Sequence, residues 1–267
     1  MALIHCQFYA ETLKLATSMM VILPQQLKSQ TTAPQLGRDG KLKTLYLLHG
    51  LSDDHTIWTR RTSIERYVTP LGIAVVMPAV QRSFYTDMAY GGAYETFIAT
   101  ELPQIARSFF PLSDARADNY VAGQSMGGYG AFKMALHYPQ NYCAAASLSG
   151  ALDIAAPVTD PTMEHRQDFI NVFGAQPNIA DTPHDLLYAA RQLIATGQEI
   201  PRLFQCCGDA DYLYQNNLAF RDFAMQAKLP VTWRADAGYA HTWDYWDLRI
   251  QTVLAWMFDA ADNLKGR

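Results

Sequence analysis

Short β-rich runs alternate with longer helical patterns along most of this 267-residue chain. This alternation is typical of βαβ units, which build a mainly parallel sheet with helices on both of its faces. We expect eight strands, the first two of them paired antiparallel, at residues 3–9, 18–23, 43–49, 73–77, 119–122, 143–148, 202–206 and 231–235. We expect the main helices at residues 57–67, 94–109, 126–137, 217–227 and 243–262.

A proline-rich stretch at about residues 151–200 interrupts this alternation. Its short helical pieces are separated by prolines at positions 157, 161, 177 and 183. We interpret the stretch as an insertion between two strands that forms a cap over a site. Because α/β folds often reach about 250 residues as one unit, we expect residues 1–267 to form a single domain.

Charge and hydropathy exclude several classes of protein. The chain has 21 Lys and Arg against 25 Asp and Glu, a net charge of −4, and no basic run longer than Arg60-Arg61. This balance argues against nucleic acid as a partner. No apolar run reaches the roughly 18 residues that cross a bilayer, and the N-terminus lacks the basic start of a signal peptide. We therefore expect a cytoplasmic protein with no membrane span.

The cysteines and histidines form no pattern that indicates a disulfide framework or a metal site. Seven histidines are scattered without a metal-binding pair, so we expect no metal and no other cofactor. The absence of C-x-x-C spacing predicts reduced thiols at all four cysteines, Cys6, Cys143, Cys206 and Cys207.

The sharpest local signal is a G-x-S-x-G motif, Gly123-Gln124-Ser125-Met126-Gly127, between a strand-like run and a helix rich in small residues. A serine in this context occupies a strained turn that exposes its hydroxyl. Side chains at the two glycines would collide with the neighbouring strand and helix. Small-residue loops also produce this pattern by chance, so Ser125 is a candidate nucleophile that needs partners elsewhere in the chain.

A serine hydroxyl needs a histidine to accept its proton and a carboxylate to orient that histidine. With this motif the acid and then the histidine follow the serine, at the ends of later strands. His241 fits best, because it lies between the last strand and the last helix. The preceding strand runs into Asp209 and Asp211, which an extended backbone points the same way; we favour Asp211, but sequence separates the two poorly. Three histidines at the far end of the serine's helix or in the cap fit less well: His137, His165 and His184.

A tetrahedral intermediate on this serine needs amide donors for its oxyanion. One candidate is the amide after the nucleophile, that of Met126, and the other comes from the loop after the third strand. In that loop Gly50 permits a sharp turn, which makes the Leu51 amide the second candidate. We expect His49, at the strand end, to shape the loop by hydrogen bonding.

Five sequence blocks together resemble a known family: LLHGLSDDHTIW, SFYTDMAYGGAYETFIATELP, GQSMGGYGAFKMAL, CCGDADYLYQNN and GYAHTWDYWD. In this order they resemble the tributyrin esterases of lactic acid bacteria and streptococci, within the esterase D group that includes S-formylglutathione hydrolases and antigen 85 mycolyltransferases. The resemblance covers nearly the whole chain. It implies an α/β-hydrolase fold with a mostly parallel eight-stranded sheet, helices on both faces and a small cap. It also implies these roles: nucleophile Ser125, base His241, acid Asp211, and oxyanion amides of Leu51 and Met126.

The function that this resemblance implies is a serine carboxylesterase acting on small short-chain acyl esters through an acyl-enzyme. S-formylglutathione hydrolase-like thioester hydrolysis and feruloyl ester cleavage are alternatives, because they use the same triad and differ in pocket contacts. A non-catalytic binding protein on the same scaffold is a remote alternative, since every required group is present. A homo-oligomer is compatible with the sequence. The candidate substrate contacts are the aromatic residues Trp58, Tyr90 and Trp243.

Overall fold

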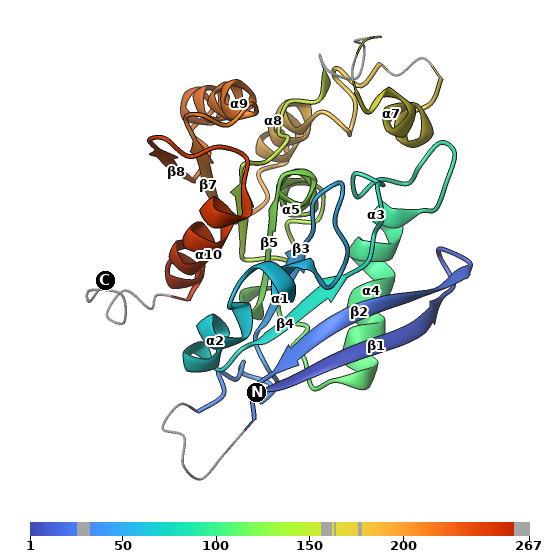
Figure 1. Cartoon of the computed structure of the whole chain (residues 1–267), viewed down its shortest axis with the longest axis vertical. Coiled ribbons are helices and arrows are strands. Elements are labelled where there is room, and N and C mark those ends of the chain that lie inside the picture. Colours follow the sequence, from blue (N-terminus) through green and yellow to red (C-terminus); the bar gives the residue numbers. More distant parts are fainter. Residues whose placement is uncertain (26–32, 156–161, 163, 176–177, 259–267) are drawn as a thin grey trace.

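An eight-stranded sheet forms the centre of the molecule (Figure 1), with the strand order β1-β2-β4-β3-β5-β6-β7-β8. The structure is a computed structural model that describes residues 1–25, 33–155, 162, 164–175 and 178–258. The strands are β1 (Ala2–Ala10), β2 (Leu15–Leu23), β3 (Thr44–Leu48), β4 (Ala74–Pro78), β5 (Asn119–Gln124), β6 (Ala144–Leu148), β7 (Arg202–Gly208) and β8 (Val231–Asp236). β1 pairs antiparallel with β2, and β2 with β4, whereas the other neighbours pair parallel. The expected eight strands and antiparallel start are thus confirmed.

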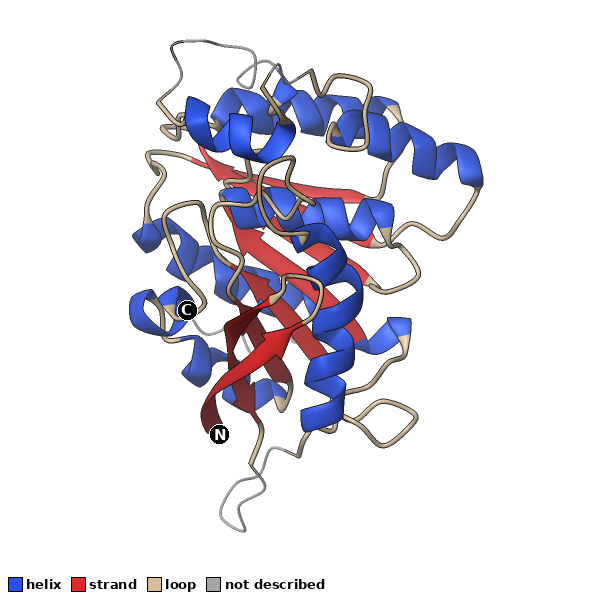
Figure 2. Cartoon of the chain, turned by 90° about the vertical axis from the view of Figure 1, so that its right-hand side faces the viewer, coloured by secondary structure: helices blue, strands red, loops and turns tan. Residues whose placement is uncertain are grey.

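Helices cover both faces of this sheet (Figure 2). They are α1 (Ile57–Arg61), α2 (Ile64–Val68), α3 (Tyr94–Thr96), α4 (Leu102–Phe109), α5 (Met126–His137), α7 (Arg166–Phe173), α8 (Leu186–Thr196), α9 (Tyr214–Gln226) and α10 (Trp243–Met257). Strand side chains alternate between two apolar clusters because successive residues point to opposite faces. In β3, Tyr46 and Leu48 join the cluster with α4, α5, α8 and α9, while Leu45 and Leu47 join the cluster with α1, α2 and α10. In the described part of the chain, no helix is long and apolar enough to cross a bilayer.

The helix expected at 57–67 is two short helices, α1 and α2, separated at Thr62. Thr62 has an extended backbone, and its amide and hydroxyl both donate to the Trp58 carbonyl. The same hydroxyl accepts a hydrogen bond from the Ile64 amide. A threonine side chain that bonds nearby backbone groups competes with the helical pattern, which explains the break.

The helix expected at 94–109 contains a wider, π-helical turn, η2 (Phe97–Glu101), between α3 and α4. Pro103 has no amide proton, so it cannot donate to the Ala99 carbonyl, four residues before it, as an α-helix would require. That carbonyl instead accepts a hydrogen bond from the Asn141 side chain at 3.3 Å. The proline therefore gives the widened turn a physical reason, which helical periodicity does not reveal.

The proline-rich stretch contains α7 and α8, which follow β6 and precede β7. Asp185 caps α8, since its carboxylate accepts hydrogen bonds from the Leu187 and Tyr188 amides. Three of its four prolines, at positions 157, 161 and 177, lie outside the described residues, as do positions 259–262 of the last expected helix. α10 is described from Trp243 to Met257.

The parallel strands β3, β5, β7 and β8 all end at the same edge of the sheet. Their carboxyl ends lead into four loops whose residues line one cavity: Leu51, Ser125, Tyr212 and His241. The carboxyl edge of such a sheet is the usual position of binding sites in α/β folds. Parallel pairing is thus what brings together residues that are far apart in sequence.

Candidate active site

Ser125 lies at the sharp turn between β5 and α5, with φ 54° and ψ −120°. A non-glycine residue at positive φ is uncommon and strained. The two flanking glycines permit the turn because their neighbours lie too close for a side chain. A Cβ at Gly123 would lie 2.4 Å from the Gly127 carbonyl oxygen, and one at Gly127 would lie 2.5 Å from the Leu48 carbonyl oxygen. The expected reason for both glycines is therefore present in the structure.

Ser125, His241 and Asp211 form a continuous chain of hydrogen bonds. The Ser125 Oγ to His241 Nε2 distance is 2.9 Å, and His241 Nδ1 lies 2.8 and 3.0 Å from the two Asp211 carboxylate oxygens. Because an ionised carboxylate only accepts, Nδ1 carries a proton and donates it to Asp211. Nε2 is then free to accept a hydrogen bond from the Ser125 hydroxyl. This is the arrangement that makes a serine nucleophilic.

The Asp211 carboxylate is fully buried and well supplied with donors, whereas 14% of the His241 side chain is exposed. Burial raises the pKa of Asp211, but the His241 ring, the Leu213 amide and the Ser149 hydroxyl outweigh it and hold that pKa below its usual value. The Leu213 amide donates to Asp211 at 2.8 Å. Asp211 is therefore ionised at neutral pH beside the imidazole it orients.

Asp209, the other acid of the same turn, has a different partner. Its carboxylate accepts a hydrogen bond from the Gly238 amide at 2.7 Å, and Gly238 has φ 81°. Asp209 thus fastens the turn that leads to His241, and the structure brings Asp211, not Asp209, to the imidazole. The coordinates are needed to distinguish Asp211 from Asp209 as the partner of the imidazole, since sequence places the two carboxylates on the same side of an extended backbone.

Leu51 and Met126, the two residues expected to supply oxyanion amides, both line the cavity beside Ser125. Met126 is the first residue of α5, where backbone amides have no acceptor within the helix. Within the described residues, neither amide donates a hydrogen bond to a protein acceptor. Both amides are therefore available to a negatively charged oxygen at the serine, and the N-terminus of α5 favours such a charge.

Hydrogen bonds hold the loop of Leu51 in place. His49 Nδ1 donates to the Gly50 carbonyl at 2.8 Å, and Nε2 accepts from the Val80 amide at 3.1 Å. Burial lowers the pKa of His49 to about 4, so the ring is neutral and able to accept. The Tyr85 hydroxyl donates to the His49 carbonyl at 2.8 Å. His49 thus shapes the loop by hydrogen bonding, as the sequence indicated.

Comparison with known proteins shows the family to which the chain belongs. A family model described as a putative esterase matches residues 11–257. The chain belongs to this esterase family. An acetyl esterase of Caldicellulosiruptor saccharolyticus is 29% identical over 269 residues, which cover 98% of this chain and 100% of that relative.

Two solved structures from Staphylococcus aureus are each 35% identical to this esterase, over 96% of its chain and 98% of theirs. They are the fluorophosphonate-binding serine hydrolase F, with a TM-score of 0.86, and an S-formylglutathione hydrolase, with a TM-score of 0.83. The α/β-hydrolase fold is thereby confirmed, and the chain is a carboxylic ester hydrolase of the serine type. The comparisons support the wider esterase D, S-formylglutathione hydrolase and antigen 85 group and do not extend to tributyrin esterase itself.

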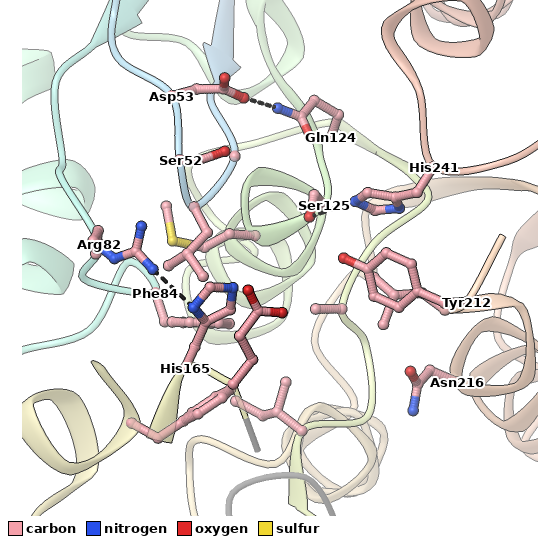
Figure 3. A pocket seen from close by; sticks show the side chains of 18 of the residues that line it. Ser52, Asp53, Arg82, Phe84, Gln124, Ser125, His165, Tyr212, Asn216 and His241 are labelled. Atoms are coloured by element: carbon pink, nitrogen blue, oxygen red, sulfur yellow. Dashed lines mark hydrogen bonds between the residues drawn. The ribbon is translucent and has the colours of Figure 1, made fainter. Parts of the chain in front are cut away.

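The cavity of the esterase, about 490 Å³, opens beside Ser125 (Figure 3). Its apolar lining includes Leu51, Phe84, Met126, Ala151, Ile154, Phe169, Leu213, Trp243 and Trp246. Its polar lining includes Ser52, Asp53, Arg82, Gln124, Asp153, Glu164, His165, Tyr212, Asn216 and His241. Apolar and charged side chains thus share the walls around the serine.

Of the three aromatic residues expected to contact substrate, only Trp243 lines this cavity. Trp58 is 1% exposed; its indole donates to the Leu48 carbonyl and packs edge-on against Trp243 at 5.1 Å. Trp58 therefore supports the cavity wall from behind. Tyr90 is 61% exposed, and its amide donates to the Asn171 carbonyl of α7. The structure thus places Trp58 and Tyr90 outside the lining of this cavity.

One wall of the cavity is held by an ion pair that the sequence did not indicate. The Arg82 guanidinium contacts both oxygens of Asp168 on α7, at 2.9 and 2.7 Å. Figure 3 shows that it also lies beside His165, whose Nδ1 is 3.2 Å away. This two-point contact fastens the inserted segment to the loop after β4. Arg82 and Asp168 stand 86 residues apart, outside any motif. Only an aligned set of relatives carrying both residues could have signalled it.

Asp53 and Gln124 form a second unexpected contact beside the serine. The Gln124 side-chain amide donates to Asp53 at 2.6 Å (Figure 3). Gln124 directly precedes Ser125, and Asp53 follows the loop of Leu51, so the bond ties that loop to the end of β5. Burial raises the pKa of Asp53, against the effect of the Gln124 bond.

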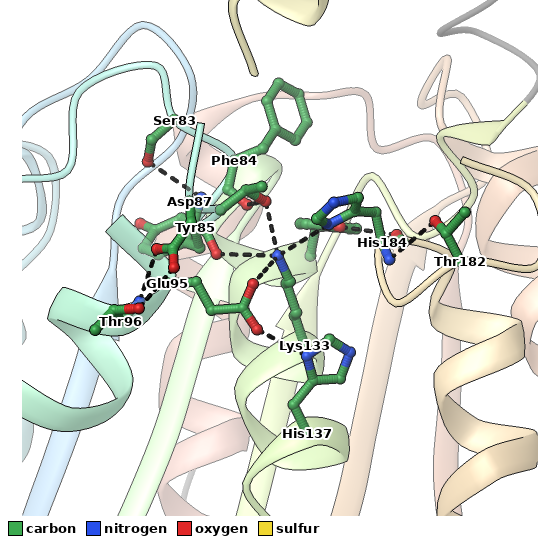
Figure 4. A network of polar contacts seen from close by, with 12 residues as sticks. Ser83, Phe84, Tyr85, Asp87, Glu95, Thr96, Lys133, His137, Thr182 and His184 are labelled. Carbon is green, nitrogen blue, oxygen red and sulfur yellow. Dashed lines mark hydrogen bonds and ion pairs between the residues drawn. The ribbon is translucent and has the colours of Figure 1, made fainter. Parts of the chain in front are cut away.

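A buried polar network lies around Lys133 on α5, whose side chain has no exposed surface (Figure 4). Its ammonium contacts the Glu95 carboxylate at 2.6 Å and donates to the Thr86 hydroxyl at 2.7 Å. Glu95 also accepts from His137 Nδ1 at 2.8 Å. The ammonium lies 3.5 Å from Nδ1 of His184, in the inserted segment. One cation thus joins the serine's helix to the loop after β4 and to the insertion.

Among the described residues, no group of three or more His, Cys, Asp or Glu side chains is arranged to hold a metal ion. The four cysteines are unpaired by disulfide bonds.

Proposed function

We propose that this esterase hydrolyses short-chain acyl esters, of the size of acetyl to butyryl, through an acyl-enzyme on Ser125. The observation that carries the proposal is the hydrogen-bonded chain from Ser125 through His241 to Asp211, opening on a cavity. Tributyrin, whose acyl chains are butyryl, fits this class of substrate.

The reaction follows from the donors and acceptors at the serine. Ser125 Oγ attacks the carbonyl carbon while its proton passes to His241 Nε2, and Asp211 stabilises the resulting imidazolium. The carbonyl oxygen becomes an oxyanion that accepts from the Leu51 and Met126 amides. The tetrahedral intermediate collapses, and the alcohol leaves with the proton from Nε2. Water then attacks the acyl carbon while its proton passes to Nε2, and the second tetrahedral intermediate collapses to release the acid as Nε2 returns the proton to Ser125 Oγ.

The walls of the cavity favour a short acyl chain. Leu51, Phe84 and Met126 provide apolar contact near the serine, but Arg82 and Glu164 also line the same cavity. A long chain would have to lie against these charged groups and remove water from them, which costs free energy. We expect a chain of two to four carbons to bring less apolar surface against these groups.

Thioester hydrolysis of S-formylglutathione is the second candidate. It is favoured by the 35% identity with the S-formylglutathione hydrolase of Staphylococcus aureus and by the charged residues of the cavity. Arg82, Asp153 and Glu164 could meet the charges of a peptide-like thiol leaving group. The chemistry at Ser125 would be unchanged.

We also propose that residues 1–267 form one domain in which the segment at about 151–200 acts as a cap. Glu164, His165 and Phe169 of this segment line the cavity, and Asp168 is fastened to Arg82. A cap held by this pair would limit the volume available to the leaving group.

A panel of p-nitrophenyl esters from acetate to palmitate, with S-formylglutathione and methyl ferulate, tests the proposal. We expect kcat/KM to be highest at acetate to butyrate and at least about tenfold lower for palmitate. Ser125→Ala is the matched control, and it should lose about 10⁴-fold or more in kcat while keeping its thermal unfolding temperature.

Each other result of this panel has a definite meaning. Turnover that survives Ser125→Ala would remove the serine mechanism, and no turnover of any substrate by the wild-type protein would favour a binding protein. A kcat/KM for S-formylglutathione above that of every ester would select the second candidate. A preference for methyl ferulate would select feruloyl ester cleavage.

A further inference from the structure

A second cavity, of about 350 Å³, lies beside the C-terminal end of α5, away from Ser125. Ser125 precedes the first residue of this 12-residue helix and Tyr138 follows its last, so the helix separates the two sites by roughly 18 Å. The cavity is lined by Tyr46, Ala99, Thr100, Pro103, Gln104, Arg107, Tyr138, Gln140, Asn141 and Tyr142. None of these residues belongs to the proposed reaction.

Two tyrosines that line this cavity have buried, unpartnered hydroxyls. Tyr46 and Tyr142 are each 1% exposed, and neither hydroxyl has a hydrogen-bond partner among the described residues. Their rings pack edge-on, with centroids 6.1 Å apart. A buried hydroxyl without a partner costs free energy. Two such groups in the wall of one cavity indicate a ligand that can bond to both.

The charge of the cavity comes from Arg107. Its guanidinium donates to two uncharged oxygens, the Ser113 carbonyl and the Asn119 side-chain amide, at 3.3 and 3.4 Å. Within the described chain it forms no ion pair with a carboxylate. Burial raises the pKa of Tyr46 to about 12, against the opposing charge of Arg107. Burial likewise raises the pKa of Tyr142, so both phenols keep their protons and can donate.

A carboxylate in contact with a residue of the wall is already paired with a cation. The Tyr138 hydroxyl donates to Glu95 at 3.4 Å, and Glu95 is paired with Lys133 and bonded to His137. This side of the cavity therefore adds no unbalanced negative charge that would repel an anion.

The π-helical turn forms part of the same wall. Ala99 and Thr100 belong to this turn, and Asn141 donates to the Ala99 carbonyl that Pro103 leaves without its helical donor. π-helical turns inside α-helices occur frequently at functional sites because they widen the helix locally. The turn is thus a second feature, independent of the tyrosines, that lies at this cavity.

We propose that this cavity binds a small anion with two or more oxygen acceptors, the chemistry of a carboxylate or a phosphate. The Tyr46 and Tyr142 hydroxyls donate to its oxygens, and Arg107 supplies the opposite charge. The site is separate from the Ser125 cavity and does not depend on the proposed esterase reaction.

Calorimetric titration with inorganic phosphate and with acetate, in chloride at matched ionic strength, tests the proposal. The wild-type protein should bind one or both anions, and the preferred anion distinguishes the two sources of this chemistry. The double variant Tyr46→Phe/Tyr142→Phe should bind at least about tenfold more weakly, since it loses two hydrogen bonds to a charged group. Arg107→Gln should weaken binding in the same direction.

Tyr120→Phe is the matched control, because its hydroxyl donates to the Ala117 carbonyl and is not part of the cavity. It should bind the anion as the wild type does. Without anion, the double variant should unfold at the wild-type temperature or above it, because it loses only unpartnered hydroxyls. Two results would overturn the proposal: no binding of either anion, or equal binding by the double variant, which would place the anion elsewhere, for example at Ser125.

Discussion

Two histidine–carboxylate pairs in this molecule have the same geometry and different surroundings. His241 Nδ1 lies 2.8 Å from Asp211, and His137 Nδ1 lies 2.8 Å from Glu95. Nε2 of His241 meets the Ser125 hydroxyl at a cavity, whereas Glu95 also binds the buried ammonium of Lys133. A carboxylate-bound histidine is therefore not enough to make a base. The hydroxyl at its other nitrogen and access to a cavity distinguish the two pairs.

The largest expected difference between the pairs is in activity. His241→Ala should lower kcat on p-nitrophenyl acetate by about 10⁴-fold or more, because Ser125 loses its proton acceptor. His137→Ala should stay within about threefold of wild type. Steady-state kinetics at 25 °C on both variants measure kcat. A similar loss of kcat in the two variants would mean that the two histidine–carboxylate pairs do not differ in catalytic role.

The two carboxylates in the turn after β7, those of Asp209 and Asp211, allow a second comparison between a group that contacts His241 and one that does not. Asp211→Asn should lower kcat by about 10³- to 10⁴-fold, because an amide no longer fixes the protonated Nδ1 of His241. Asp209→Asn removes a bond to the Gly238 amide and should cost about tenfold or less. A larger loss in Asp209→Asn than in Asp211→Asn would reverse the assignment of the acid.

The Lys133 network should matter for stability. Lys133→Met leaves the Glu95 carboxylate without its buried cation and should lower the free energy of unfolding by about 3–5 kcal/mol. The double variant Lys133→Met/Glu95→Gln should recover part of that loss, since no charge is left unpaired. Urea unfolding of the wild type, the single variant and the double variant measures these free energies of unfolding. If the double variant were no more stable than the single one, the ion pair would not be the cause.

Acidification should lower the free energy of unfolding through Glu95, the carboxylate of the same network. Burial raises the pKa of Glu95, but His137 and Lys133 outweigh it and lower that pKa to about 2 from its ordinary 4.5. A carboxyl with a lowered pKa contributes stability above its unfolded pKa, and loses it as pH falls through the folded one. Glu95 should thus contribute up to about 3 kcal/mol that disappears between pH 4.5 and pH 2. Unfolding followed across this range in wild type and Glu95→Gln should give a shallower slope in the variant, and parallel slopes would contradict it.

The periodicity of apolar residues and the positions of glycine and proline predicted most of the fold, because these signals are local in the sequence. All eight strands lie where apolar, β-branched runs indicated them, and α5 begins and ends at the expected residues, Met126 and His137. The two expected helices that are interrupted depend on single side chains, Thr62 and Pro103, each of which changes the donor that a backbone carbonyl receives. Such competition between bonds is not visible in a pattern of apolar spacing. The helix expected at 217–227 begins earlier, as α9 at Tyr214.

The candidate site was predictable where a motif and the order of residues along the chain restrict the choice. Ser125 and His241 followed from a motif and from chain order, but Asp209 and Asp211 alternate along one turn and needed coordinates. Trp58 and Tyr90 were assigned to the cavity because aromatic residues suit pocket walls and core packing equally well. Contacts such as Arg82–Asp168 join distant segments, and one sequence contains no signal for them.

The backbone of Ser125 has a consequence for attempts to make this protein more robust. Its positive φ is one that glycine adopts without strain, so Ser125→Gly should relieve the turn while removing the nucleophile. A screen that selects for thermal stability alone will enrich variants that are inactive because Ser125 is replaced. Directed evolution of heat resistance here has to score turnover in the same round.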